Sequence, residues 1–146
     1  MKTFFEKLRN LFITGRQDAI TTPVQPDRDK LSTEKALIDE YMYMKKPFLY
    51  NRYSIFQLSE ETGICMFDLM AIIHRQHRTN FNDFLDSYRI SYCKQLLDQV
   101  PLYTLDVFDL TVICGFTDQE RFCAAFKKVT RVPVSKYIRK LCRDRL

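Results

Sequence analysis

An internal repeat constrains the fold of this chain more than any other feature of its sequence. When the sequence is compared with itself at a shift of 52 residues, and of 53 after one inserted residue, a pattern recurs. The pattern is a capped apolar segment, a glycine and a second apolar segment. Gly63 aligns with Gly115, and each supplies the left-handed backbone that a sharp corner between two helices needs. The repeat therefore predicts two helix-turn-helix units, at about 54–77 and 106–130.

The rest of the chain is predicted to be helical as well. Only three glycines in 146 residues leave little material for the turns of a multi-stranded sheet, and apolar residues recur at helical spacing. We expect an all-α fold of about seven helices, in which a long linker helix, about 80–98, joins the two helix-turn-helix subdomains. A short amphipathic helix over 2–14 and a linker form the expected N-terminal region, 1–31, ahead of a domain over 32–146.

Caps, glycines and prolines set the expected helix ends, and helical spacing sets the expected buried faces. The helices expected in the domain run from Ser32 or Thr33 to Lys46, and over about 54–63, 65–77, 80–97, 106–114, 118–130 and 134–143. The positions expected to be buried are Leu37, Tyr41 and Met44 in the first helix, Leu69, Ile72, Ile73 and Gln76 in the first repeat, and Phe122, Ala125, Phe126 and Val129 in the second. The opposite face of the second helix in each repeat is left for solvent or for a partner.

Composition and cysteine spacing argue against several classes of protein. With 46% apolar and 28% charged residues, the chain has the profile of one soluble domain. Its longest apolar run, 69–73, is far shorter than the roughly 20 residues of a membrane span. Five cysteines without a Cys-x-x-Cys pair indicate neither a disulfide framework nor a zinc site, which suits a reducing cytoplasm. Cys93 and Cys114 lie on apolar stripes and are expected in the core.

The sequence shows no arrangement of residues that is typical of catalysis or of cofactor binding. It has no paired carboxylates, no nucleophile with a base and no glycine-rich phosphate loop. His74 and His77 are three residues apart, but no third ligand follows at a suggestive spacing, so no metal site is expected. We therefore expect neither an enzyme nor a protein with a bound cofactor or metal.

Basic residues are concentrated near the C-terminal end of the sequence. Residues 1–30 carry a net charge of +2, residues 31–116 a net charge of −3, and residues 117–146 a net charge of +6. This distribution favours a localised patch for a polyanion, although a basic run at a chain end can also be only a solvated tail.

Three stretches of the sequence resemble the AraC/XylS family of transcription regulators. They are DFLDSYRI at 83–90, QLL at 95–97, and the region 115–128, which begins GFTDQERF and ends FKK. The resemblance covers about residues 34–141 and includes both repeats.

The resemblance implies a two-module DNA-binding domain. In this family the long linker helix holds the second helix of each helix-turn-helix unit on the same side of double-stranded DNA. The two helices then enter successive major-groove segments about 34 Å apart. RNA polymerase is the implied protein partner. Because only about thirty residues precede the domain here, where most members have a sensor or dimerisation domain, we expect a stand-alone cytoplasmic domain that is monomeric or weakly dimeric and has no effector pocket.

The second helix of the first repeat allows two interpretations. Its candidates for base contacts are Phe67, Met70 and Ala71, and its candidates for phosphate contacts are His74, Arg75 and Arg78. Phe67 and Ala71 offer apolar contact to thymine methyl groups. Alternatively, exposed Phe and Met side by side are typical of a surface that docks a protein.

The second helix of the second repeat points more clearly to DNA. Gln119, Glu120 and Arg121 lead it, and their side chains suit the edges of adenine, cytosine and guanine respectively. Further candidates are Cys123 and Ala124 for base contacts and Thr117, Lys127, Lys128 and Arg131 for phosphate contacts. The sequence thus predicts a sequence-specific, double-stranded-DNA-binding transcription regulator that does not associate with a membrane. The alternative is a protein-interaction module that keeps the fold and docks a partner through the first repeat.

Overall fold

The computed structural model describes residues 28–145, and this part of the chain is helical without any strand. Its elements are α2 (Arg28–Lys45), η1 (Pro47–Leu49), α3 (Ile55–Thr62), α4 (Met66–His77), α5 (Phe81–Gln99), η2 (Leu102–Thr104), α6 (Val107–Ile113), α7 (Gln119–Thr130) and α8 (Val134–Asp144). Seven α-helices within the described residues confirm the predicted all-α fold. The helix predicted over 2–14, and most of the linker after it, lie outside the described residues.

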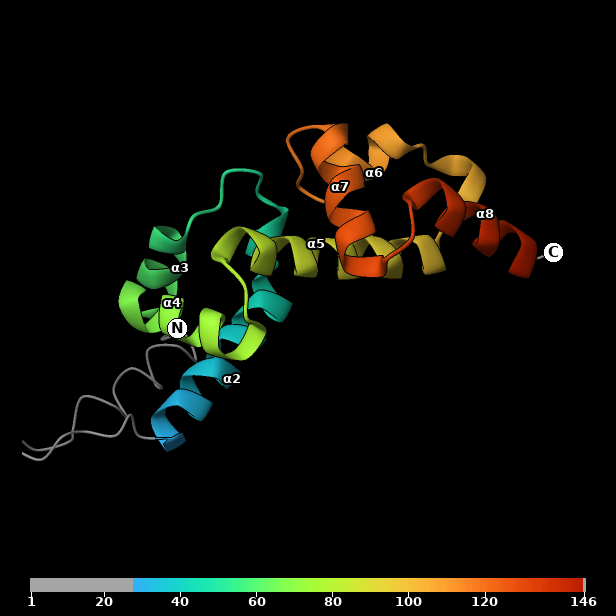
Figure 1. Ribbon diagram of the computed structural model, residues 1–146. Helices are drawn as coiled ribbons and strands as arrows, with labels where there is room; N and C mark the ends of the chain where they lie inside the picture. The colour runs from blue at the N-terminus through green and yellow to red at the C-terminus, as the bar shows by residue number, and fades with distance from the viewer. Residues whose placement is uncertain (1–27, 146) are drawn as a thin grey trace, which may run out of the picture.

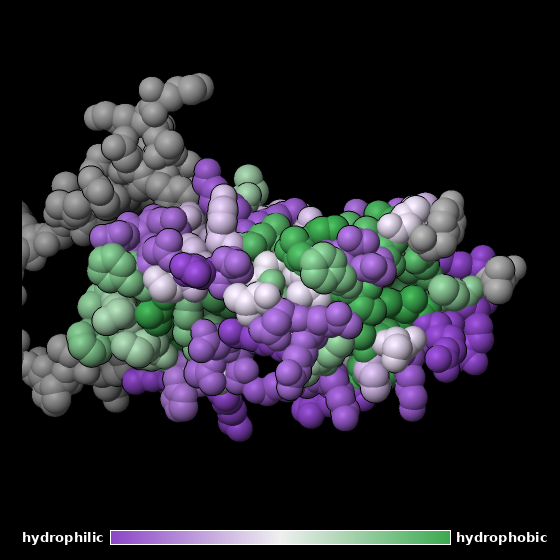
Figure 2. Space-filling view, turned by 90° about the horizontal axis from the view of Figure 1, so that it is seen from above, coloured by the Kyte–Doolittle hydropathy of each residue, from purple (hydrophilic) through white to green (hydrophobic). Residues whose placement is uncertain are grey.

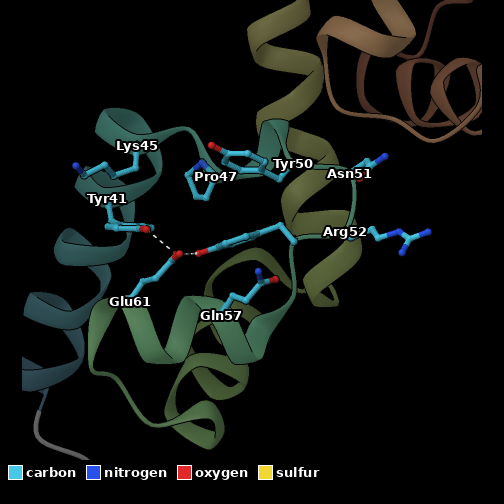
Figure 3. Close-up of a pocket in the computed structure, with 9 residues that line it drawn as sticks. Tyr41, Lys45, Pro47, Tyr50, Asn51, Arg52, Gln57 and Glu61 are labelled. Carbon is cyan, nitrogen blue, oxygen red and sulfur yellow. Dashed lines mark hydrogen bonds between the residues drawn. The ribbon is translucent and has the colours of Figure 1, made fainter.

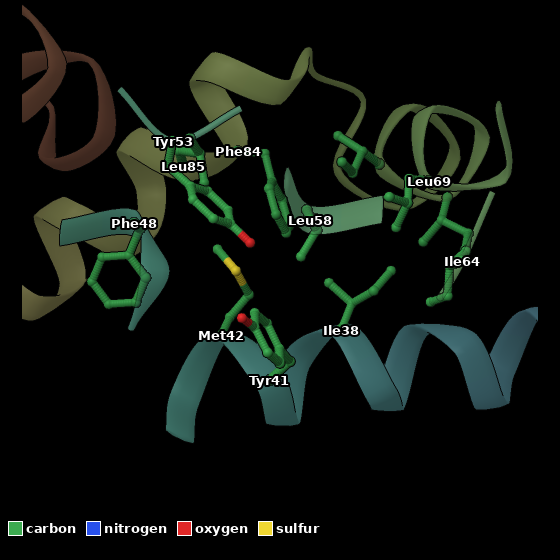
Figure 4. Packing of buried hydrophobic residues seen from close by; sticks show 12 residues of the cluster. Ile38, Tyr41, Met42, Phe48, Tyr53, Leu58, Ile64, Leu69, Phe84 and Leu85 are labelled. Carbon is green, nitrogen blue, oxygen red and sulfur yellow. The ribbon is translucent and has the colours of Figure 1, made fainter. Parts of the chain in front are cut away.

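The long helix α5 is the axis of the molecule (Figure 1). Helices α2, α3 and α4 gather around its N-terminal part, and α6, α7 and α8 gather around its C-terminal part. Two separate cores result, which we call the first and second subdomain. Helix α5 gives Phe84 and Leu85 to the first core and Ile90, Cys93 and Leu97 to the second. Figure 4 shows the first core, where side chains of α2 lie beneath those of α3, α4 and α5.

Local caps begin the helices of both repeats where the sequence predicts them. Ser54 and Gln57 form a capping box at the start of α3, and Asp106 and Asp109 form the equivalent box at the start of α6. Asn80 caps α5 by accepting a hydrogen bond from the backbone N–H of Asp83 at 2.9 Å. These caps satisfy amide groups that the first turn of a helix leaves without partners.

The expectation for the first helix of the domain was wrong in two respects. Helix α2 begins at Arg28, ahead of the predicted caps Ser32 and Thr33. Its buried face is also rotated, because Ile38 and Met42 fill the core beside Tyr41 while Met44 is 67% exposed. The apolar positions of α2 allow two overlapping stripes, and only packing against α3 and α5 selects between them. Left-handed Lys46 and the following Pro47 end the helix.

Two residues expected in the core lie at its edge. Gln76 of α4 is exposed, and Val129 of α7 is 42% exposed. Both stand in the last turn of their helix, beyond the three buried positions that each stripe does contain. The apolar stripe of each second helix is therefore one turn shorter than the periodicity predicts.

The cysteines are distributed as the apolar stripes predict. Cys93 and Cys114 are fully buried in the second core, whereas Cys65 and Cys142 are exposed and Cys123 is half-buried. The Cys93 thiol lies against Cys114, and this contact together with burial raises its pKa. Among the described residues, no helix combines the length and hydropathy that a transmembrane span requires.

Candidate nucleic-acid interface

The first turn of α7 projects three polar side chains from a firmly capped helix end. Asp118 accepts a hydrogen bond from the backbone N–H of Arg121 at 2.8 Å and another from the Thr117 hydroxyl at 2.9 Å. These bonds hold the pKa of Asp118 below its usual range. Gln119, Glu120 and Arg121 are all exposed. The amide, carboxylate and guanidinium groups that the sequence analysis assigned to base reading therefore stand together at one helix end.

The two faces of α7 differ sharply in chemistry. Phe122, Ala125 and Phe126 are buried against the second core. The opposite face exposes Ala124, Lys127, Lys128 and Arg131, with Cys123 half-buried beside it. This arrangement gives α7 an apolar side that fixes its position and a basic side that is accessible to a polyanion.

Two of the candidate residues on α7 also contact acidic side chains of α5. The Lys128 ammonium lies 2.7 Å from a carboxylate oxygen of Asp83, and this contact lowers the pKa of Asp83. The Arg121 guanidinium is 3.8 Å from Asp86. Both basic side chains remain accessible, at 63% and 43% exposure. The acidic partners are not apparent from the repeat, because they belong to a different helix.

Helix α4 presents a mixed surface in the first subdomain. Phe67 is 74% exposed and Met70 is 43% exposed, while Ala71 is half-buried and His74 and Arg75 are exposed. The face thus changes from apolar at the start of the helix to basic at its end. This geometry leaves both interpretations of α4 from the sequence analysis in place.

Both second helices end at an arginine with left-handed backbone. Arg78 has φ 49° and Arg131 has φ 65°, and each donates its backbone N–H to the carbonyl four residues earlier. A non-glycine residue in this region costs about 1–2 kcal/mol. Each arginine therefore stands where glycine would be less strained, and both arginines are exposed.

An arginine of α5 joins the two subdomains. Arg89 is 3% exposed, and its guanidinium donates to the backbone carbonyls of Phe48 and Tyr50 at 2.6 and 3.1 Å. It also pairs with Asp86 at 3.0 Å and lies over the ring of Phe116 at 5.3 Å. Burial lowers the pKa of this guanidinium, and Asp86 opposes that effect. The buried guanidinium of Arg89 thus contacts both the first subdomain and Phe116, the residue after Gly115 in the second repeat.

Sequence reasoning gave Arg89 no role of its own. A signal was available, because Asp86 and Arg89 are three residues apart between the apolar residues Leu85 and Ile90. Opposite charges at this spacing, embedded in an apolar stripe, indicate a buried pair. The carbonyl groups that complete the arrangement come from η1 and the residue after it, and no pattern in the sequence points to them.

His74 and His77 do not form a metal site with other described residues. Within 28–145, no group of three potential ligands among His, Cys, Asp and Glu is close enough to hold an ion. The ring of His77 instead packs edge-on against Phe84, with 5.1 Å between the ring centres. His77 therefore has a packing role at the end of α4.

Comparisons with known proteins identify the fold. No protein-family description matches the chain, and no curated protein is significantly similar to it in sequence. Among solved structures, it resembles the C-terminal domain of the two-component response regulator YesN from Fusobacterium nucleatum, with a TM-score of 0.54, 20% identity, and coverage of 75% of this chain and 98% of that one. The chain shares its fold with this regulator domain.

Two further structures support the same conclusion about the fold. The C-terminal domain of AraT, a response regulator from Geobacillus stearothermophilus, has a TM-score of 0.53 and 18% identity, over 82% of this chain and 88% of that one. A Listeria innocua protein of unknown function has a TM-score of 0.54 and 24% identity, over 69% and 92%. These identities are low, so the likeness concerns the arrangement of helices.

A cleft of about 500 Å³ lies beside the first core, between the end of α2, residues 50–53 and one side of α3. Figure 3 shows Glu61 at its centre, where the carboxylate accepts hydrogen bonds from the hydroxyl groups of Tyr41 and Tyr53. Burial, followed by the contact with Glu61, raises the pKa of both tyrosines above the ordinary value of 10.0. The cleft therefore contains a hydrogen-bonded network that ties α2 to α3.

We expect this network to make the protein sensitive to alkaline pH. Because the folded state holds the hydroxyl protons of Tyr41 and Tyr53 more tightly than the unfolded state, the stability that this network contributes is constant up to about pH 10 and falls above it. Replacing Tyr53 by Phe removes one of these protons and is expected to make that fall shallower. Thermal midpoints measured between about pH 9 and pH 11 test this. Tyr43→Phe, at a side chain that is 74% exposed, is the control, and equal pH slopes in both variants would contradict the prediction.

Proposed function

We propose that this protein is a sequence-specific, double-stranded-DNA-binding transcription regulator. The first turn of α7 carries the proposal, because Gln119, Glu120 and Arg121 are exposed together on a capped helix whose other face is anchored in the core. Thr117, Lys127, Lys128 and Arg131 lie near enough along the chain to contact phosphates on either side of such a reading end. The resemblance of the sequence to AraC/XylS regulators and the fold shared with response-regulator domains support this assignment.

In the proposed mechanism, the basic side of the second subdomain associates with DNA and α7 then enters the major groove. The side chains of Gln119 and Arg121 can each form two hydrogen bonds with a single base edge, which gives each about 1–3 kcal/mol of discrimination. Helix α4 contributes Arg75 and Arg78 to the backbone, with Phe67, Met70 and Ala71 facing the bases. The bound protein recruits or obstructs RNA polymerase in the cytoplasm.

We expect base-reading and phosphate-contacting residues to respond differently to alanine substitution. On a site selected from a random duplex library, Arg121→Ala and Gln119→Ala each weaken binding about 5- to 150-fold and relax the preference at one position. Lys127→Ala weakens binding to all sequences alike. It also reduces the slope of the logarithm of the binding constant against the logarithm of the salt concentration by about one. Binding titrations at several salt concentrations measure both effects. Unchanged affinity and preference in the first two variants would refute base reading by α7.

A second candidate function rests on the exposure of Phe67 and Met70. An apolar pair at the start of a reading helix also suits a protein-interaction module that has kept the fold. The double variant Phe67→Asp, Met70→Asp separates the two functions. An intact affinity for the selected DNA site, with a lost protein contact, would favour the interaction module.

A further inference from the structure

The first subdomain leaves an apolar surface uncovered. Phe67 is 74% exposed and Met70 is 43% exposed on α4, and Phe56 of α3 is 60% exposed. Figure 2 shows apolar side chains gathered at the end of the molecule that these helices form. Large apolar side chains that stand together in solvent are typical of a surface that another segment or partner covers. We call Phe67 and Met70, which stand three residues apart on α4, the apolar end.

The chain itself supplies a segment of matching chemistry. Residues 4–12, which lie outside the described residues, place Phe5, Leu8 and Phe12 along one side of the predicted amphipathic helix, with Phe4 and Leu11 beside them. An amphipathic helix commonly docks by laying such a face into an apolar surface. Residues 4–12 therefore offer several large apolar side chains to a surface that exposes Phe67 and Met70.

The connection between this segment and the apolar end is short. Helix α2 begins at Arg28, and its first turn reaches α4, where the ammonium of Lys30 lies 4.0 Å from a carboxylate oxygen of Asp68. Asp68 is the residue next to Phe67. The 13 residues 15–27 span up to roughly 45 Å when extended, which is more than twice the roughly 18 Å length of a 12-residue helix such as α4. The tether thus reaches every part of the apolar end.

Charge favours the same pairing. Residues 4–12 carry Lys7 and Arg9 against a single acid, Glu6. Asp68, which follows Phe67 directly on α4, is acidic and exposed. A tethered segment has an effective concentration on the order of millimolar, so modest apolar and ionic contacts suffice to hold it.

We propose that residues 4–12 dock as a helix on the apolar end and cover the start of α4. The occupant is this chain's own N-terminal segment, held by burial of Phe67 and Met70 and by its basic side chains. If α4 contacts DNA, which rests on the function proposed above, the docked segment and DNA compete for the same face. The N-terminal segment is then an autoinhibitory element, and DNA binding requires its release.

A single tryptophan tests the docking without DNA. The chain contains no tryptophan, so Phe67→Trp makes the apolar end the only source of indole fluorescence. We expect blue-shifted emission that acrylamide quenches weakly. Adding Leu8→Asp, on the apolar side of the segment, is expected to shift the emission to the red and to raise the quenching constant at least two-fold. Asn10→Asp, on the opposite side of the same helix, adds the same charge and is expected to change neither.

Two outcomes of this experiment would overturn the docking. Emission and quenching that stay the same with and without Leu8→Asp would mean that the segment does not cover Phe67. A blue shift that is lost on dilution would show that a second copy covers the apolar end instead. Phe5→Asp repeats the measurement at another position of the apolar side, so that the result does not depend on one substitution.

DNA titration separates the regulatory claim from the docking claim. With Phe67 intact, Leu8→Asp is expected to tighten binding to the selected site about three- to ten-fold, while Asn10→Asp leaves it unchanged. An equal effect of both variants would overturn autoinhibition, because only added charge would then matter. If no variant prefers any DNA site, the proposed function fails and the autoinhibition of DNA binding fails with it, but the fluorescence result for docking stands.

Discussion

Replacing Gly115 by alanine is expected to lower the free energy of unfolding by about 3 kcal/mol. Gly115 has φ 79°, a conformation that costs a side-chain-bearing residue about 1–2 kcal/mol. A Cβ atom here would also stand 2.5 Å from the backbone oxygen of Leu49, a distance at which one of the two must move. Forcing extra volume into a packed site typically costs a further 1–3 kcal/mol or so.

The other glycine of the repeat provides a matched control for this prediction. Gly63 has φ 72°, but a Cβ atom added to it meets nothing within 4 Å. Gly63→Ala is therefore expected to cost only the backbone term, about 1 kcal/mol. Urea denaturation of both variants measures the difference. Equal losses of unfolding free energy in the two variants would mean that the backbone of Leu49 moves aside at no cost. The contact between η1 and the second repeat would then not fix the two subdomains against each other.

Features set by neighbouring residues could be predicted from the sequence. The caps Ser54, Asn80 and Asp106 act on amides within their own first turn, so a short stretch of sequence contains the whole interaction. The repeat likewise indicated the two corners, because glycine adopts the left-handed backbone of such a turn at the least cost. The predicted all-α fold is confirmed for these reasons.

Features set by packing could not be predicted in the same way. The buried face of α2 depends on which stripe fits α3 and α5, so Met42 replaced Met44 in the core. Within the candidate interface, the exposed first turn of α7 follows from its own sequence. The ion pair of Lys128 with Asp83 does not, because it joins residues that are 45 positions apart. Such contacts need the relative position of two helices, which no local pattern contains.

Replacing Arg89 by methionine is expected to have the largest effect on stability, about 3–5 kcal/mol. The substitution keeps much of the side-chain volume but removes the donors to the carbonyls of Phe48 and Tyr50. It also leaves the carboxylate of Asp86, whose side chain is only 12% exposed, without its close partner. Buried acceptors that lose their donors are not rehydrated, so their desolvation is no longer offset. Thermal and urea unfolding both measure the loss.

Arg145 provides the control, because it also donates to two backbone carbonyls, those of Leu97 and Val100. Its side chain is 36% exposed, so water replaces the lost donors and Arg145→Met is expected to cost about 1 kcal/mol or less. Adding Asp86→Asn to Arg89→Met removes the carboxylate charge, which among the described residues then has only Arg121, at 3.8 Å, as a partner. The double variant is expected to restore part of the loss and to leave the two unpaired carbonyls. If the double variant is no more stable than Arg89→Met, the whole loss of stability comes from the hydrogen bonds to the carbonyls of Phe48 and Tyr50. In that case Arg89 holds the two subdomains together as a hydrogen-bond donor, and its charge is incidental.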